Sequence, residues 1–120
     1  MRVAGIGFRD GAGIDSLRWV LAAVEAKGGA ADALATLPEK APALRALAEE
    51  RSLPLHSVSV AGVDTPTRSP RIEAMHGTGS VAEAAALVAA GTGARITVAR
   101  ITAPDGMATC AMAEVEGRNE

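Results

Sequence analysis

The spacing of apolar residues changes along the chain, and each change predicts a new element. The apolar run over residues 2–6 predicts a strand, and the glycines after it predict a flexible turn. A helix is expected next, with Asp15 as a plausible cap and Gly28-Gly29 at its end. Its apolar residues recur at helical spacing as Leu17, Val20, Leu21 and Val24.

The same alternation of strand and helix continues. Residues 33–37 read as a second, weak strand before Pro38, and a second helical face ends near Arg51. That face is marked by Leu44, Leu47 and Ala48. Residues 55–60 predict a third strand with Val58 and Val60 on one side.

The third helix begins after a polar stretch over residues 61–76. Within that stretch, Ser69-Pro70 is suited to start one short helical turn. Ser80, followed by Glu83 at the third position, predicts a reciprocal capping box at the start of a helix that Gly91 ends.

The last two strands, residues 95–101 and 107–113, flank an Ala-Pro-Asp-Gly turn and predict an antiparallel hairpin. The order of elements therefore predicts an α/β fold. We expect a mixed, mostly parallel sheet of about five strands, with helices as crossover connections and the hairpin at its end.

Length and composition restrict the organisation of the chain. Its 120 residues, 48% of them hydrophobic, allow one domain over residues 1–120, with a frayed tail from about residue 115. The net charge of -2 argues against electrostatic binding to nucleic acid or membranes. The single Cys110, with no secretory or spanning segment, predicts the reducing cytoplasm.

The loops after the strands are the expected binding site, since ligands of open α/β sheets lie beyond the carboxyl ends of the strands. These loops hold basic residues, hydroxyls and glycines that suit an anionic ligand. Carboxylates in the same loops weaken the argument from charge. An equal alternative to a binding site is that these are ordinary loop charges in contact with solvent. The expected ligand-binding residues are Gly7, Arg9, Thr36, Lys40, Arg68, Gly77, Thr78, Gly79 and Ser80, with Arg71 and Thr65 nearby.

Sharper catalytic motifs are absent or incomplete. Residues 5–10 hold two glycines of a dinucleotide fingerprint, but Asp10 stands where the third belongs. No P-loop and no metal-ligand spacing are present, so neither a cofactor nor a metal site is expected. Ser80 and His76 do not form a triad, which leaves His76 as a weak catalytic candidate.

Three other residues have simpler interpretations. Cys110 and Met112 are expected in the core. Trp19 falls opposite the apolar stripe of its helix and is expected to be exposed. It marks either a partner surface, through which an oligomer could form, or a ring lying over neighbouring side chains.

Three segments together resemble the family formed by the cobalamin-biosynthesis protein CobE and the carboxy-terminal domain of CbiG. They are residues 3–11, residues 77–87 and residues 106–111, and the resemblance spans nearly the whole chain. The Ser-Val-Ala-Glu-Ala-Ala-Ala run is the most specific part. Where many CbiG-type domains have Cys followed by Arg-Arg, this chain has Phe8-Arg9-Asp10, which removes one basic group and a thiol.

The resemblance implies a three-layer α/β/α sandwich that acts in corrin-ring synthesis, a branch of tetrapyrrole metabolism. The implied ligand is a precorrin, whose acetate and propionate carboxylates fit the basic loops. Three hypotheses follow. The first is a precorrin-binding or handover module, which is favoured because no clear nucleophile, metal site or paired catalytic acid is present. The second is a lactone hydrolase-like enzyme in which His76 or a loop carboxylate activates water. The third is a subunit that docks on another pathway enzyme through Trp19.

Overall fold

The computed structural model describes residues 1–116, which form five strands and four helices in the order β1-α1-β2-α2-β3-α3-α4-β4-β5. The strands are β1 (Arg2–Phe8), β2 (Ala33–Thr36), β3 (Leu55–Ser57), β4 (Arg95–Thr102) and β5 (Ala108–Glu114). The helices are α1 (Ile14–Gly28), α2 (Ala41–Arg51), α3 (Pro70–His76) and α4 (Val81–Ala90). No helix in this part of the chain has the length and apolar character needed to cross a membrane.

The strands form one mixed sheet in the order β3-β2-β1-β5-β4. β1, β2 and β3 are parallel neighbours, whereas β5 pairs antiparallel with both β1 and β4. The predicted hairpin is therefore confirmed, but the sheet is not mostly parallel. The reason is that β5 returns along β1 over its whole length, from Arg2 opposite Glu114 to Phe8 opposite Ala108.

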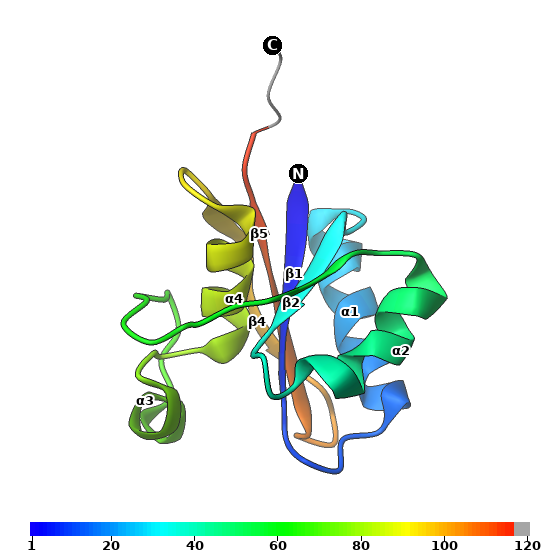
Figure 1. The fold of residues 1–120 in the computed structure, drawn as a ribbon, viewed down its shortest axis with the longest axis horizontal. Helices are drawn as coiled ribbons and strands as arrows, with labels where there is room; N and C mark the ends of the chain where they lie inside the picture. Colours follow the sequence, from blue (N-terminus) through cyan, green and yellow to red (C-terminus); the bar gives the residue numbers. More distant parts are fainter. Residues whose placement is uncertain (117–120) are drawn as a thin grey trace.

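Helices cover both faces of the sheet (Figure 1), with α1 and α2 on one face and α4 on the other. Successive β1 residues point to opposite faces, so Ala4 and Ile6 join the core under α1 and α2 while Val3 joins the core under α4. Gly5 also faces α4, where a Cβ atom would lie 2.0 Å from the Ala82 carbonyl oxygen. The absence of a side chain at Gly5 is what allows α4 to lie this close to β1.

The predicted helices and strands are confirmed, with local corrections at the start of α1 and at the end of β3. Asp15 is not a cap, because α1 begins after Gly13 without a side-chain cap and Asp15 lies in its first turn. β3 ends at Ser57, so Val58 and Val60 follow the strand, although both pack in the core under α4. The buried stripes of α1 and α2 and the burial of Cys110 and Met112 agree with the sequence.

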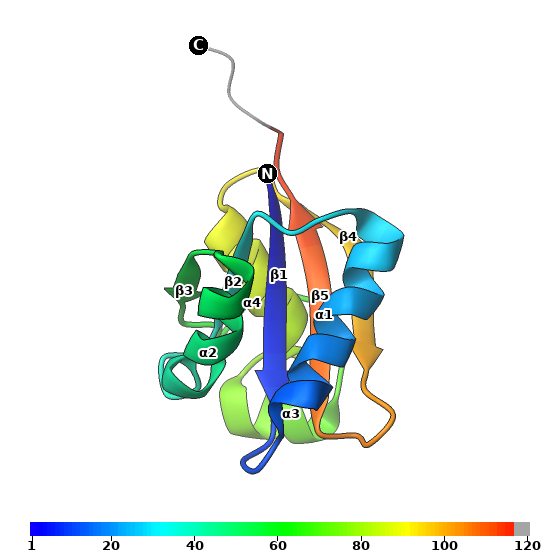
Figure 2. The same cartoon turned by 90° about the vertical axis from the view of Figure 1, so that its right-hand side faces the viewer.

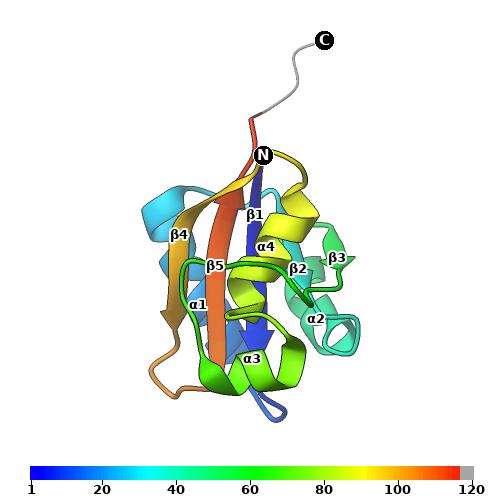
Figure 3. The ribbon, with the colours of Figure 1, turned by 90° about the vertical axis from the view of Figure 1, so that its left-hand side faces the viewer.

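α3 extends the single turn that was predicted at Ser69-Pro70. The Ser69 side chain accepts a hydrogen bond from the Ile72 amide, and the helix ends at Gly77 in the left-handed conformation, with φ of 72°. None of its residues is buried. Figure 3 shows α3 crossing below α4, next to the lower ends of β1 and β5.

The terminal residues of the sheet are paired. The backbones of Met1 and Val115 exchange two hydrogen bonds of 2.8 and 3.0 Å. The predicted frayed tail therefore does not begin at Val115, which is held by Met1, and residues 117–120 of that tail lie outside the described residues.

Candidate functional site

A cavity of about 510 Å³ opens at the carboxyl end of β1, where β5 begins and β4 ends. Figure 2 shows β1 pointing towards α3, which lies at this end of the sheet. The volume lies in the range of small-molecule sites, and the position follows the rule for open α/β sheets. The lining residues are Gly7, Phe8, Arg9, Asp10, Leu37, Lys40, Ser69, Arg71, Ile72, Met75, His76, Ser80, Val81, Arg100, Thr102, Gly106, Met107, Ala108 and Thr109.

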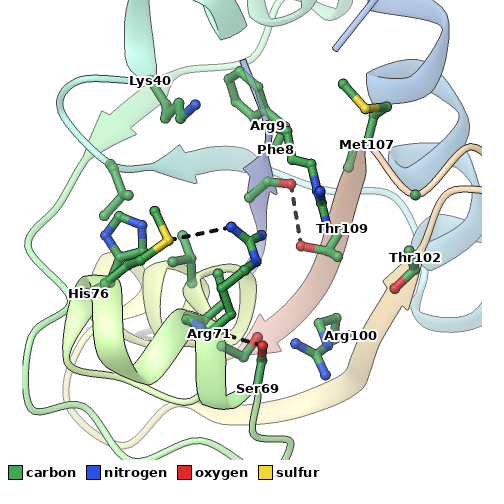
Figure 4. A pocket seen from close by; sticks show the side chains of 18 of the residues that line it. Phe8, Arg9, Lys40, Ser69, Arg71, His76, Arg100, Thr102, Met107 and Thr109 are labelled. Atoms are coloured by element: carbon green, nitrogen blue, oxygen red, sulfur yellow. Dashed lines mark hydrogen bonds between the residues drawn. The ribbon is translucent and has the colours of Figure 1, made fainter. Parts of the chain in front are cut away.

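The cavity gathers positive charge on a chain whose net charge is -2. Four of its lining residues are basic, namely Arg9, Lys40, Arg71 and Arg100, and only Asp10 is acidic. Figure 4 shows these basic side chains reaching the same space from different elements. Within residues 1–116, no carboxylate forms a salt bridge with any of the three arginines. Their guanidinium groups are available for an anionic ligand.

Lys40 differs from the arginines because it already has a partner. Its ammonium group lies 2.7 Å from the Asp10 carboxylate and 5.2 Å from the centre of the Phe8 ring. The hydrogen bond and the positive charge of Lys40 lower the pKa of Asp10. An anion that binds Lys40 therefore competes with Asp10.

The rest of the lining is largely apolar. Phe8 is the last residue of β1 and Met107 immediately precedes β5, whereas Ile72 and Met75 come from α3. Met75 is 60% exposed, and its sulfur accepts a hydrogen bond of 3.4 Å from Arg71. The site therefore suits a ligand with a large apolar body and several carboxylates.

The structure brings together part of the predicted set. The cavity lining includes four of the expected ligand-binding residues and the catalytic candidate, namely Gly7, Arg9, Lys40, Ser80 and His76. The Ser80 hydroxyl also caps α4, accepting a hydrogen bond of 3.2 Å from the Glu83 amide. Ser80 is 1% exposed, so its main role here is to start the helix.

The predicted threonines do not line the cavity. Thr36 is fully buried and donates its hydroxyl to the Ile6 carbonyl at 2.7 Å. Thr78 is 3% exposed and donates its hydroxyl to the Val63 carbonyl. Both hydroxyls hold neighbouring segments together within the fold.

The glycines after α3 and Arg68 also lie outside the lining. Gly77 contributes instead to an adjoining hollow of about 520 Å³. Gly79 packs so tightly that an added Cβ would lie 2.7 Å from the Thr65 hydroxyl and 2.8 Å from a backbone carbonyl. Arg68 forms a salt bridge with Glu73. Gly77 and Gly79 therefore pack against the protein's own loop over residues 61–69.

The predicted capping box is only half formed. The carboxylate of Glu83 does not return to Ser80 but accepts hydrogen bonds from the Thr67 amide and hydroxyl, both at 2.9 Å, and from the Arg100 amide at 2.8 Å. These partners lie 16 and 17 residues away in sequence. A local motif could not indicate them.

Sequence reasoning missed the cavity residues on β4 and β5, of which Arg100 is the most important. Strict alternation along β4 places Arg100 on the same face as Val98, in the core under α1. Arg100 is basic, yet alternation predicts that it lies in the core. This conflict is the signal that could have indicated an irregular strand. The structure shows register shifts on both sides of Val98, so Arg100 faces the cavity and Ile101 packs into the core.

Two further features bear on the chemistry of the site. Among residues 1–116, no group of three His, Cys, Asp or Glu side chains could hold a metal ion. Trp19 is 44% exposed on α1, as expected, and lies outside the cavity lining.

Comparisons with known proteins agree on one family. Residues 2–113 match the family model described as "Cobalamin synthesis G C-terminus". No curated protein sequence matches the chain. Among solved structures, CobE from the cobalamin (vitamin B12) biosynthetic pathway is similar, with 28% identity and a TM-score of 0.81 over 98% of this chain and 95% of that one.

Two other solved structures are similar. Cobalamin biosynthesis protein chiG from Agrobacterium tumefaciens is 36% identical over 98% of this chain and 100% of that one, with a TM-score of 0.74. A cobalamin biosynthesis protein G homolog from Sulfolobus solfataricus shares the fold, with a TM-score of 0.72 and 19% identity. That match covers 93% of this chain but only 36% of the longer protein.

Proposed function

The chain belongs to the cobalamin synthesis G C-terminus family, and we propose on this basis that it binds a precorrin, a corrin-ring intermediate, in the basic cavity. The structural layers support the three-layer α/β/α domain that the sequence resemblance implies, with α1 and α2 on one face and α4 on the other. The proposed role is binding or handover within cobalamin synthesis.

The observation that carries this proposal is the set of three cavity arginines, without acidic partners in residues 1–116, beside an apolar wall. Acetate and propionate carboxylates surround a precorrin ring, and a guanidinium group can hold a carboxylate through two parallel hydrogen bonds. The wall formed by Phe8, Ile72 and Met75 can contact the ring itself. We infer that a cavity of about 510 Å³ holds one edge of such a ring and leaves the rest exposed, which suits handover to another protein.

Binding without turnover is favoured by the surroundings of His76. Within the described residues, His76 lines the cavity but no hydrogen bond joins its imidazole to a carboxylate that would orient it. General base catalysis by histidine usually relies on such an orienting partner. The described surroundings of His76 therefore favour binding over the activation of water.

The test is a titration with purified precorrins, followed by their visible absorbance, with uroporphyrin as a stable probe. Uroporphyrin carries an acetate and a propionate on every pyrrole, whereas coproporphyrin has methyl groups in place of the acetates. We expect reversible spectral shifts, and tighter binding of uroporphyrin than of coproporphyrin. Equal, weak binding of both pigments would contradict a site built for several carboxylates.

Arg9→Ala provides the residue-specific version of this test. Each charged hydrogen bond to a bound carboxylate contributes roughly 1.5 to 3 kcal/mol, so we expect uroporphyrin to bind at least about tenfold more weakly. Arg45→Ala is the matched control, because Arg45 is exposed on α2 and does not line the cavity. Melting temperatures of both variants should stay near the wild-type value, since both side chains are exposed.

The same titration separates the other two hypotheses. A product of new mass that accumulates with time, and is lost in His76→Ala, would favour the lactone hydrolase-like enzyme. Unchanged pigment spectra, together with binding to another pathway enzyme that Trp19→Ala abolishes, would favour the docking subunit.

A further inference from the structure

Glu83 is a buried carboxylate for which the proposed function has no role so far. It is fully buried in the first turn of α4, and its hydrogen-bond donors are two backbone amides and one hydroxyl. No salt bridge joins it to a basic side chain within residues 1–116. A buried carboxylate is costly unless hydrogen bonds replace its hydration, and here each oxygen has at least one donor. Its position near the helix N-terminus also favours a negative charge.

The donors that Glu83 binds belong to two different segments, each of which contributes residues to the cavity. Oε1 accepts from Thr67, two residues before Ser69 starts α3, and Oε2 accepts from the Arg100 amide on β4. Ser69 and Arg100 both line the cavity. The carboxylate therefore joins the segment that leads into α3 to the strand that carries one of the free arginines.

The irregular register of β4 explains why the Arg100 amide is available. Val98 pairs with Met112 and Ile101 pairs with Cys110, so three steps along β4 correspond to two along β5. Such a bulge leaves one residue outside the regular ladder and changes the direction of its neighbours. Arg100 lies inside this irregular stretch, and Glu83 accepts the hydrogen bond that its amide donates.

We propose that Glu83 is a positioning residue, which holds the β4 bulge in place and thereby directs the Arg100 guanidinium to a carboxylate of the ligand. The inference rests on the proposed function, because it assigns Arg100 to the same anionic ligand. It goes further in making binding depend on a buried group that the ligand does not touch.

A double-mutant cycle tests this coupling, with uroporphyrin as the ligand. Arg100→Ala removes the guanidinium, and Glu83→Gln places amide hydrogens against donors that already point at the side chain. We expect each single variant to bind uroporphyrin about tenfold more weakly. In the Arg100→Ala background, Glu83→Gln should weaken binding by less than about twofold, because the effects of two substitutions that act through the same contact do not add. Additive losses would overturn the proposal.

Thr67→Val separates positioning from general stability. It removes one of the two donors to Oε1 and leaves the contact between Oε2 and Arg100. We expect a lower melting temperature with uroporphyrin affinity within about twofold of wild type. A loss of affinity equal to that of Glu83→Gln would show that binding follows stability alone, and the proposal would fail.

A replacement variant and a crystallographic measurement cover the cases in which Glu83→Gln does not fold or the wild type does not bind. If Glu83→Gln does not fold, Glu83→Asp replaces it in the cycle, since aspartate keeps the charge but withdraws the oxygens by one methylene. If wild-type protein does not bind uroporphyrin or a precorrin, the proposed function fails separately. Crystal structures of the wild type and the Glu83 variant then decide the inference, which an unmoved β4 bulge and Arg100 side chain would overturn.

Discussion

Gly5→Ala tests the close packing of α4 on β1. A Cβ atom at this position would lie 2.0 Å from the Ala82 carbonyl oxygen and 2.6 Å from the Ala86 amide nitrogen. Both are backbone atoms of α4, so no side-chain rotation relieves the clash. To bring the shorter contact to a tolerable distance, α4 has to withdraw from β1 by about 1 Å, and the packed core resists such a movement.

The expected free-energy change combines two opposing effects. Overpacking of a well-packed interior typically costs about 1–3 kcal/mol, and backbone clashes fall at the upper end of that range or above it. Replacing glycine by alanine also restricts the unfolded chain, which offsets roughly 0.4–1 kcal/mol. We therefore expect a net loss of about 2–3 kcal/mol and a melting temperature lower by about 8–12 °C.

Gly7→Ala is the matched control, because Gly7 lies on the same strand and the same face. Its Cβ would lie 3.2 Å from the Thr109 hydroxyl and 3.4 Å from the Val81 Cβ, contacts that small side-chain movements can relieve. Urea unfolding followed by circular dichroism should place this variant within about 1 kcal/mol of wild type. If Gly5→Ala is as stable as Gly7→Ala, the close packing of α4 on β1 is refuted.

Three further predictions concern single side chains. Asp10→Asn should strengthen uroporphyrin binding by about threefold to fivefold, because it frees Lys40 from a competing surface ion pair. The control Glu49→Gln makes the same charge change at an exposed site on α2 and should have no effect on binding. Weaker binding by Asp10→Asn would show instead that Asp10 orients Lys40. Ser80→Ala should lower the free energy of unfolding by about 0.5–2 kcal/mol in chemical denaturation through loss of the α4 cap, and an unchanged value would contradict that role. Burial raises the pKa of the Cys110 thiol, so above about pH 8.5 only the unfolded chain loses the thiol proton. The free energy of unfolding should therefore fall as the pH rises past that value, and a Cys110→Ala variant should lack this part of the pH dependence.

The sequence by itself determined those features that depend on near neighbours in the chain. The stripe from Leu17 to Val24 predicted the buried face of α1, because side chains three and four apart share one side of a helix. Ser80 predicted the start of α4, because a cap needs only the amides of the next turn. The Pro-Asp-Gly turn predicted the hairpin for the same local reason, and the motif over residues 77–87 indicated the family.

Tertiary structure alone decided which of those residues meet in space. Thr36 and Thr78 had the right chemistry for a binding loop, but carbonyls 30 and 15 residues away use their hydroxyls within the fold. Glu83 satisfied a capping pattern, yet its carboxylate binds the loop at Thr67 and the bulged strand at Arg100, donors that local spacing does not reveal. Arg100 reaches the cavity only because β4 departs from strict alternation against β5. Long-range pairing distributes polar groups between structural and ligand-facing roles, and it depends on strand order and register rather than on any one segment.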